Sequence, residues 1–248
     1  MRILVVEDMG IAGAMADSEL TQVTPCEPVV VFDPVAALDR LRSESFDAAV
    51  IDMLFLAQSD DFERRRRDGR VRLTDTRLHV SGLAPLRAAS AAGIPAVLWS
   101  SGEPNRRLHM IFAHEELGCR SMCPKDVRGK LATAVQDVVA GREHIDPILR
   151  MHLPPKSAPT LRETFFSSGS RRAIWRAMAL GLHDHARIGR AVGVTSGTVR
   201  RSVEEMRSKL VAFDPGCSDA GPPTAQLVSY ASRNWEFFLD DTVREVYP

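Results

Sequence analysis

Short apolar segments alternate with longer helical ones in the first half of the chain, and this alternation constrains the fold most strongly. Runs as short and as rich in β-branched residues as "RILVV" are typical of strands buried on both faces of a parallel sheet. Parallel strands also need helical crossovers between them. We therefore predict an α/β fold with a five-stranded, doubly wound parallel sheet, its strands at residues 2–6, 28–32, 48–52, 95–100 and 120–123.

Helical segments fill most of the intervals between these strands. Asp33-Pro34 supplies an N-cap and a first-turn proline for one helix, and Gly141 is placed to end the last one. The expected helices are residues 11–20, 34–42, 81–92, 105–117 and 127–140. The interval from about 55 to 80 contains "DDFERRRRDGRVRLTD", which is charged and has no apolar stripe, so we interpret it as an insertion after the third strand.

The second half of the chain is predicted to be a separate, all-α domain. Residues 146–165 are poorly periodic and rich in proline, which is typical of a linker. This interpretation gives one domain at residues 1–145 and a second at 166–248. Helices are expected in the second domain at residues 171–180, 185–192, 195–210 and 224–246.

The distribution of charge supports this division. The formal net charge of the 248 residues is zero, but residues 170–210 alone carry +6 and the rest of the chain carries −6. Such an asymmetry suggests an acidic module joined to a basic, nucleic-acid-binding one.

Composition excludes several other classes of protein. No apolar run approaches the roughly 18 residues of a membrane span, so we expect no membrane association. The acidic pair Glu7-Asp8 comes too early for a signal peptide. The cysteines are scattered, which disfavours zinc and favours a reducing, cytoplasmic location: they are Cys26, Cys119, Cys123 and Cys217.

Polar residues follow the strands at the edge of the sheet where doubly wound folds bind ligands. In the strand order 2-1-3-4-5, the strand ends bring together carboxylates, an ammonium group and two hydroxyls: Glu7, Asp8, Asp52, Lys125, Ser100 and Ser101. Clustered carboxylates repel one another, and a hard cation such as Mg²⁺ stabilises them. Asp52 alone could simply cap a turn. In these surroundings it has the character of a nucleophile that becomes an aspartyl-phosphate.

These residues resemble the receiver (CheY-like) domain of bacterial response regulators over about residues 1–145, and "PKDVRGKLATAVQDVVAG" resembles the NarL/FixJ branch. The resemblance implies that a sensor histidine kinase phosphorylates Asp52. It implies phosphate contacts from Ser100 and Lys125, with Met122 at the switch position. It also implies a set of Mg²⁺ ligands: Glu7 through water, Asp8, Asp52 and the Leu54 carbonyl.

Three positions depart from the receiver pattern. Met122 stands where an aromatic switch residue is usual, and Pro124 replaces an apolar residue before Lys125. The insertion enters the loop beside Asp52, where family members are short. These departures bear on how the domain switches and on how a phosphodonor reaches Asp52.

Residues 188–210, "IGRAVGVTSGTVRRSVEEMRSKL", have the pattern of a helix-turn-helix. Arg200 and Arg201 lie away from the apolar stripe, where a recognition helix meets the major groove. The stretch resembles the LuxR-type DNA-binding domain, although Glu204 stands where that family often has a basic or small residue. The resemblance implies contacts to double-stranded DNA from Thr195, Thr198, Arg200, Arg201, Glu204 and Lys209. It also implies a final helix that either forms a homodimer surface or covers the domain's own core.

Together these features predict a cytoplasmic, non-enzymatic transcription regulator controlled by phosphorylation of Asp52. An alternative keeps the DNA binding but replaces phosphorylation with a small ligand or a protein partner. A third interpretation is an aspartate-nucleophile phosphatase. It is disfavoured because those enzymes typically carry a second Asp two residues after the nucleophile, and this chain has Leu54 there.

Overall fold

The computed structural model describes all residues of the chain except 24, 56–62, 67–79, 156 and 218–220. The chain divides into two compact units. The first comprises Met1–Ser59 and His79–Leu153, and the second comprises Asp60–Leu78 and Pro154–Pro248. Each unit is described separately below.

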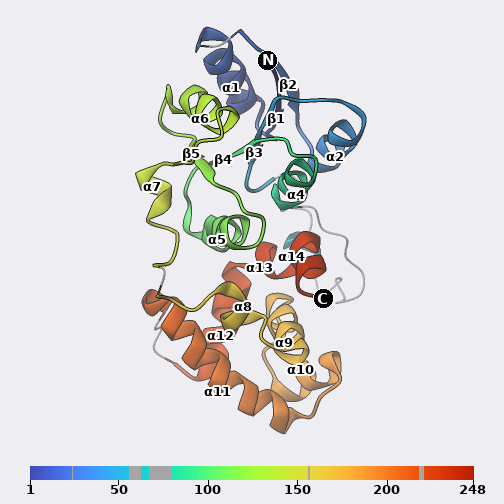
Figure 1. Cartoon of the computed structure of the whole chain (residues 1–248). Helices are drawn as coiled ribbons and strands as arrows, with labels where there is room; N and C mark the ends of the chain where they lie inside the picture. The colour runs from blue at the N-terminus through green and yellow to red at the C-terminus, as the bar shows by residue number, and fades with distance from the viewer. Residues whose placement is uncertain (24, 56–62, 67–79, 156, 218–220) are drawn as a thin grey trace. The chain divides into compact units, whose positions relative to one another are not determined.

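A parallel sheet forms the centre of the first unit, with the strand order β2-β1-β3-β4-β5-β6 (Figure 1). The strands are β1 Arg2–Val6, β2 Glu27–Val31, β3 Ala48–Asp52, β4 Ala96–Ser100, β5 Ser121–Pro124 and β6 His144–Ile145. The doubly wound α/β fold expected from the sequence is confirmed. The count of five strands is wrong, because β6 pairs in parallel with β5 through Ser121–His144 and Met122–Ile145. A strand of two residues is too short to produce a periodic pattern in the sequence.

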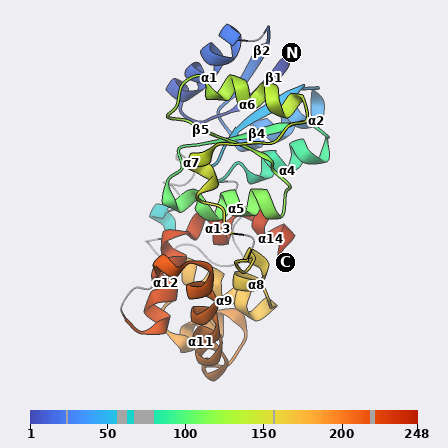
Figure 2. The same ribbon diagram turned by 60° about the vertical axis from the view of Figure 1, so that its left-hand side comes forward.

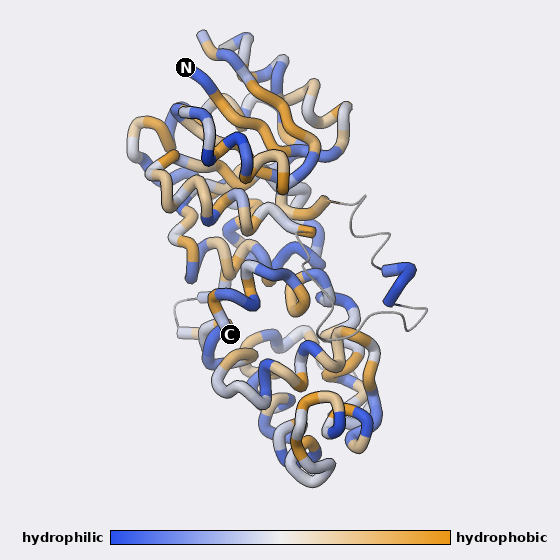
Figure 3. The backbone as a smooth tube through the Cα atoms, turned by 90° about the vertical axis from the view of Figure 1, so that its right-hand side faces the viewer, coloured by the Kyte–Doolittle hydropathy of each residue, from blue (hydrophilic) through white to orange (hydrophobic). Residues whose placement is uncertain are grey.

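Helices cover both faces of this sheet (Figure 2). On one face, α1 Gly10–Val23 and α6 Lys130–Val139 contact each other. On the other face, α4 Leu83–Ala91 contacts both α2 Pro34–Ser43 and α5 Arg107–Glu115. The side chains beneath α1 and α6 form one buried cluster, which includes Ile3, Val5, Leu20, Val50, Val97, Leu131 and Val135. The tube that follows the N-terminus, where β1 lies, is accordingly coloured as hydrophobic in Figure 3.

Helix ends in this unit follow recognisable local signals. Asp33 caps α2 as predicted, since its carboxylate accepts from the amides of Val35 (3.2 Å) and Ala36 (3.1 Å). Helix α6 begins at Lys130 rather than at residue 127, because Gly129 precedes it in the left-handed region (φ 81°). A single 3₁₀ turn, η1 Pro104–Arg106, leads into α5.

The predicted insertion after β3 lies largely outside the described residues, but its two ends are visible. The amide of Phe55 donates to Val80 O (3.0 Å), and the amide of Gly82 donates to Met53 O (3.0 Å). Leu54 and Ser81 face each other between these bonds as an isolated antiparallel bridge. This neck, formed by residues 53–55 and 80–82, joins the two ends of the insertion immediately after Asp52.

The second unit is helical (Figure 1). Its helices are α8 Leu161–Phe165, α9 Gly169–Ala179, α10 His185–Val192, α11 Ser196–Phe213, α12 Pro223–Arg233, α13 Trp235–Leu239 and α14 Asp241–Val246, with a 3₁₀ turn η2 Pro215–Cys217. Aromatic rings fill its core. The rings of Phe165 and Trp175 meet edge to face at 5.3 Å, and Trp175 stacks on Phe238 at 5.0 Å.

The structure adds detail to one sequence expectation for the later part of the chain and corrects another. Residues 146–165, expected to be a linker, contain α7 Pro147–Arg150 and α8, with Leu149 and Phe165 buried. The single helix expected at residues 224–246 is three helices, which end or begin at Asn234 and Asp240. The Asp240 carboxylate caps α14 by accepting from the Thr242 amide at 2.8 Å, and this cap interrupts the helical pattern.

One described part of the insertion packs within the helical unit. The Arg66 guanidinium donates to the carbonyl of Ala179 at the end of α9 (2.9 Å) and lies 5.8 Å from the centre of the Trp235 ring. Glu63 holds this guanidinium through bonds of 2.7 and 2.9 Å. Residues from the middle of the β3–α4 connection therefore complete the surface of the helical unit.

None of the helices that the structure describes is both long enough and apolar enough to span a membrane.

Candidate functional site

Asp52 is the last residue of β3, at the carboxyl edge of the sheet. Its backbone lies opposite Trp99 of β4 in the register, and its side chain is almost completely buried. The carboxylate oxygen Oδ1 accepts from the amide of Met53 (2.6 Å). Asp52 is thus fixed in orientation in a place where a charged group is costly unless it has partners.

Glu7 and Asp8 continue from the neighbouring strand β1. The amide of Glu7 still pairs with Val31 O (2.9 Å), so the backbone is held in line up to the acidic pair. Glu7 is buried and Asp8 is half-buried. One oxygen from each of Glu7, Asp8 and Asp52 lies within 4.8 Å of the other two. The structure therefore brings together the three carboxylates that the sequence placed at this edge.

Lys125 reaches this acidic group from the end of β5. Its amide donates to Ser100 O (3.0 Å), which anchors the loop. Its ammonium group lies 2.5 Å from Glu7 Oε2 and 2.8 Å from Asp52 Oδ1. The same nitrogen lies 5.2 Å from the centre of the Trp99 ring, which restricts where it can move.

Burial dominates the electrostatics of this pocket. It raises the pKa of Glu7, and the neighbouring charge of Asp52 raises that pKa further. Burial also raises the pKa of Asp52, against the opposing effects of Lys125 and, more weakly, Arg106. One ammonium group therefore does not fully compensate the buried carboxylates, and additional positive charge would be stabilised there.

The donor set fits a hard divalent cation. Carboxylate oxygens are the ligands that Mg²⁺ prefers, and Mg²⁺ usually keeps several waters beside one or two carboxylates. Asp8 and Asp52 offer such oxygens, with Glu7 behind them. The hydrogen bonds of the bridge at the neck join Phe55 to Val80 and Gly82 to Met53. Because the bridge does not use the Leu54 carbonyl, that carbonyl can serve as a further ligand.

The remaining predicted pocket residues occupy different positions. Ser100 is buried at the end of β4, and its hydroxyl accepts weakly from the Gly102 amide (3.3 Å). Met122 is completely buried within β5, between Leu98 and Ile145 in the register.

Sequence reasoning missed one charged residue near this edge. Arg106 is buried, and its guanidinium donates to the Ser101 hydroxyl (3.0 Å) and pairs with Glu103 (3.0 Å). It is the first of two adjacent arginines that follow "SSGEPN" after β4. The sequence signal available was this basic pair a few residues after the serines, but nothing in the sequence distinguishes the buried Arg106 from the half-buried Arg107.

A second candidate site lies in the helical unit, where α10 and α11 form a helix-turn-helix. Gly193 ends α10 in the left-handed region (φ 73°). A Cβ on Gly189 would lie 2.6 Å from Val194 O, so only glycine allows this close approach of helix and turn. The Thr195 hydroxyl then caps α11 by accepting from the Thr198 amide (3.1 Å).

The predicted DNA-contacting residues fall into two groups on α11. Arg200, Arg201 and Glu204 are exposed, and the described part of the chain contains no ion pair to either arginine. Thr195 and Thr198 lie at the start of the same helix, with their hydroxyls 2.9 Å apart. Lys209 is separate, because its ammonium group donates to Glu163 O of α8 (3.1 Å). The structure therefore does not group Lys209 with the exposed arginines.

An acidic pocket on a doubly wound sheet and a basic helix-turn-helix in the second unit together match a fold seen among response regulators. A solved structure of the RcsB response regulator of Salmonella typhimurium has this fold, with 14% sequence identity and a TM-score of 0.56. The match covers 94% of this chain and 99% of that one. The fold resemblance expected from the sequence is thus confirmed over nearly the whole chain.

Other comparisons are weaker. A second RcsB structure matches with a TM-score of 0.48 and 14% identity over 94% of this chain and 98% of that one. A two-component response regulator of the LuxR family from Aurantimonas sp. SI85-9A1 matches with a TM-score of 0.46 and 17% identity, over 61% of this chain and 94% of that one. No protein-family model matches the sequence, and neither does any curated protein.

Proposed function

We propose that this chain is a DNA-binding transcription regulator controlled by Mg²⁺-dependent phosphorylation of Asp52. The observation that carries the proposal is the pocket itself, in which a buried aspartate meets two further carboxylates and an ammonium group 2.8 Å away. In the same chain, α11 presents two exposed arginines at a helix-turn-helix. A sensor histidine kinase is the expected phosphodonor and double-stranded DNA the expected target.

The residues of the pocket fit the chemistry of phosphoryl transfer. The Asp52 carboxylate oxygen that does not accept from the Met53 amide attacks phosphorus. The bond from phosphorus to the donor's histidine nitrogen breaks, and an acyl phosphate forms on Asp52. Asp8, Asp52 and the Leu54 carbonyl would hold a divalent cation, which would neutralise charge on the phosphoryl oxygens. Lys125 is already positioned at Asp52 and can donate to one of these oxygens, while the Ser100 hydroxyl can donate to another.

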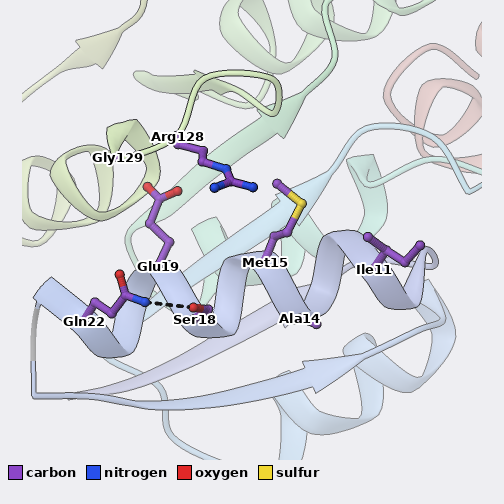
Figure 4. Close-up of a pocket in the computed structure, with 8 residues that line it drawn as sticks. All are labelled: Ile11, Ala14, Met15, Ser18, Glu19, Gln22, Arg128 and Gly129. Atoms are coloured by element: carbon purple, nitrogen blue, oxygen red, sulfur yellow. Dashed lines mark hydrogen bonds between the residues drawn. The ribbon is translucent and has the colours of Figure 1, made fainter.

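The donor protein must reach Asp52 past the rim of the pocket, and a groove beside α1 suggests where it docks. The groove has a volume of about 520 Å³. Figure 4 shows its lining: Ile11, Ala14, Met15, Ser18, Glu19, Gln22, Arg128 and Gly129. Ile11 and Met15 are exposed one turn apart, and the groove starts three residues after Asp8 and ends near Lys125 in the sequence. An amphipathic helix of the kinase that packs there would carry its histidine toward Asp52.

DNA binding is assigned to the exposed side of α11. Phosphate contacts from arginine give affinity that falls steeply with salt, and a bidentate contact from arginine to guanine gives sequence preference. Because Arg200 and Arg201 are adjacent on one helix, they point in different directions. One is expected to contact a base edge and the other the backbone.

The test is intact-mass spectrometry after incubation with Mg²⁺ and acetyl phosphate. We expect one phosphoryl group on the wild-type chain and none on Asp52→Asn. Asp126→Asn is the matched control, because Asp126 is an exposed carboxylate next to Lys125. An unmodified wild-type chain that still binds DNA specifically would instead support control by a small ligand or a protein partner.

A further inference from the structure

Arg106 is a buried cation whose partners are poor. Its side chain is only 7% exposed, yet its one ionic partner among the described residues is Glu103, whose side chain is 56% exposed. Its Nε is buried with no hydrogen-bond partner in the described part of the chain. A buried guanidinium is costly unless its donors are satisfied. A contact with a half-exposed carboxylate contributes little in compensation.

The position of this side chain indicates what it faces. Arg106 Nη1 donates to the hydroxyl of Ser101, the residue directly after Ser100. The backbone of Ser100 is in turn held to the Lys125 amide, so Arg106 is linked to the loop that lines the same strand ends as Asp52.

We propose that Arg106 is a phosphoryl-binding residue that exchanges Glu103 for the phosphoryl group on Asp52. This inference rests on the proposed phosphorylation and adds a ligand that the resemblance to receiver domains does not supply. In the unmodified chain Arg106 pairs with Glu103 and Ser101. After phosphorylation the guanidinium donates to the phosphoryl oxygens, and Glu103 is released to solvent.

The charge of the phosphoryl group explains why a cation beyond Lys125 and the divalent ion would be used. Lys125 is shared between Glu7 and Asp52 at 2.5 and 2.8 Å, so it is already engaged before phosphorylation. A phosphoryl group carries about −1.5 to −2 charge and three strong acceptor oxygens. Guanidinium groups match such oxygens with two parallel hydrogen bonds. Arg106 therefore supplies positive charge that becomes fully paired only when Asp52 is phosphorylated.

The exchange also gives the receiver a way to report its state. Met122, at the expected switch position, is buried in β5 and is not aromatic. Movement of Arg106 away from Glu103 would instead alter residues 101–106, which connect β4 to α5 through η1. Phosphorylation would then change the start of α5 through a polar contact.

The experiment uses the full chain, saturating Mg²⁺ and beryllofluoride, a phosphoryl analogue, and it measures apparent affinity by tryptophan fluorescence. We expect Arg106→Gln to weaken beryllofluoride binding about 10-fold, which corresponds to about 1.4 kcal/mol and to the loss of a hydrogen bond to a charged group. Arg106→Lys should weaken binding less. Glu103→Gln should tighten binding about 3-fold, because it frees Arg106 in the unliganded state. Arg107→Gln is the matched control, since the Arg107 Nε donates instead to His152 O (3.2 Å) and binding should not change.

Opposite effects in the Arg106 and Glu103 variants distinguish phosphoryl binding from a merely structural role. If Arg106→Gln fails to fold, Glu103→Gln decides alone, and unchanged affinity in that variant overturns the inference. Wild-type affinity in a folded Arg106→Gln chain also overturns it while leaving phosphorylation of Asp52 intact. A wild-type chain that neither binds beryllofluoride nor accepts phosphate from acetyl phosphate overturns both proposals.

Discussion

The acidic pocket of the first unit consists of buried, paired charges, whereas the basic face of the second unit consists of exposed ones. In the pocket, Asp52 and Glu7 are buried, their pKa values are raised, and Lys125 is already paired with both. On α11, Arg200 and Arg201 are exposed and make no ion pair with described residues. The pocket is therefore pre-arranged at a cost in stability, whereas the charges of the basic face have no such partners among the described residues.

Each site nevertheless depends on one glycine behind its functional residues. A Cβ on Gly82 would lie 2.0 Å from the Asp52 carbonyl oxygen, and a Cβ on Gly189 would lie 2.6 Å from Val194 O. These close contacts set the backbone from which Asp52 and the start of α11 project. The comparison shows that both sites need a fixed backbone position behind their functional residues. Only the buried pocket also needs fixed side-chain contacts.

The largest expected effect tests whether the pocket is pre-arranged for a cation. Asp8→Ala should slow phosphorylation of Asp52 by acetyl phosphate about 100-fold, because losing one electrostatic stabiliser typically costs that much. The rate is measured by intact mass over time in the presence of Mg²⁺. Asp126→Asn should react like the wild type. A rate unchanged in Asp8→Ala would show that the carboxylate cluster does not act through a bound cation.

Removal of single arginines from the basic face should have a smaller effect on DNA affinity. Arg200→Ala and Arg201→Ala should each weaken binding to a selected DNA site about 10- to 100-fold, in line with about 1–3 kcal/mol per specific arginine contact. The backbone-contacting arginine should also reduce the salt slope by about one when it is removed. Lys209→Ala should change the affinity little, since the Lys209 ammonium group is held by Glu163 O. Equal losses in all three variants, in a fluorescence titration, would contradict the separation of Lys209 from the arginines.

A third prediction concerns the backbone behind the basic face. Gly189→Ala should lower the free energy of unfolding by about 1–3 kcal/mol, because the new methyl group must displace the turn at Val194. Specific DNA binding should fall with it. Gly197→Ala is the matched control, since its Cβ would meet only the Thr195 hydroxyl at 3.8 Å. Urea unfolding followed by circular dichroism measures the difference, and equal stability of the two variants would argue against the close approach.

The smallest effect is the pH dependence of the pocket. The pKa values of Glu7 and Asp52 are raised in the folded state. Their contribution to stability is therefore complete at a pH below their pKa values in the unfolded chain. It is lost as the pH rises through their pKa values in the folded chain. Mg²⁺ should offset this loss, adding about 1 kcal/mol, or about 2–4 °C in Tm, at pH 8 and less at pH 5.

Thermal melts at the two pH values, with and without Mg²⁺, check this sign. Asp52→Asn should reduce both the pH dependence and the effect of Mg²⁺, because it removes one of the two coupled carboxylates. A Mg²⁺ effect that is larger at pH 5 than at pH 8 would contradict the assignment to these groups.

Much of the fold and most of the pocket could be predicted from the sequence, for physical reasons. Buried parallel strands leave continuous apolar runs, and the order of strands then places Glu7, Asp52 and Lys125 at one edge. Strand β6 left no such signal, since two residues have no period. The break at Asp240 was missed because apolar residues continue at helical spacing through it, although the Asp240 side chain caps a new helix. Arg106 could not be distinguished from Arg107, because its burial depends on how η1 packs.

The contact of Arg66 with Ala179 and Trp235 has a consequence for any attempt to dissect this chain. The helical unit is not contiguous in the sequence, since it comprises Asp60–Leu78 as well as Pro154–Pro248. A cut after Leu153 would leave Arg66 on the N-terminal fragment, whereas Ala179 and Trp235 would be on the C-terminal one. The C-terminal fragment would therefore lack the hydrogen bond to Ala179 O and the guanidinium over the Trp235 ring. The C-terminal fragment alone would be an incomplete fold, and the two pieces should behave as a complementation pair that reassembles when mixed.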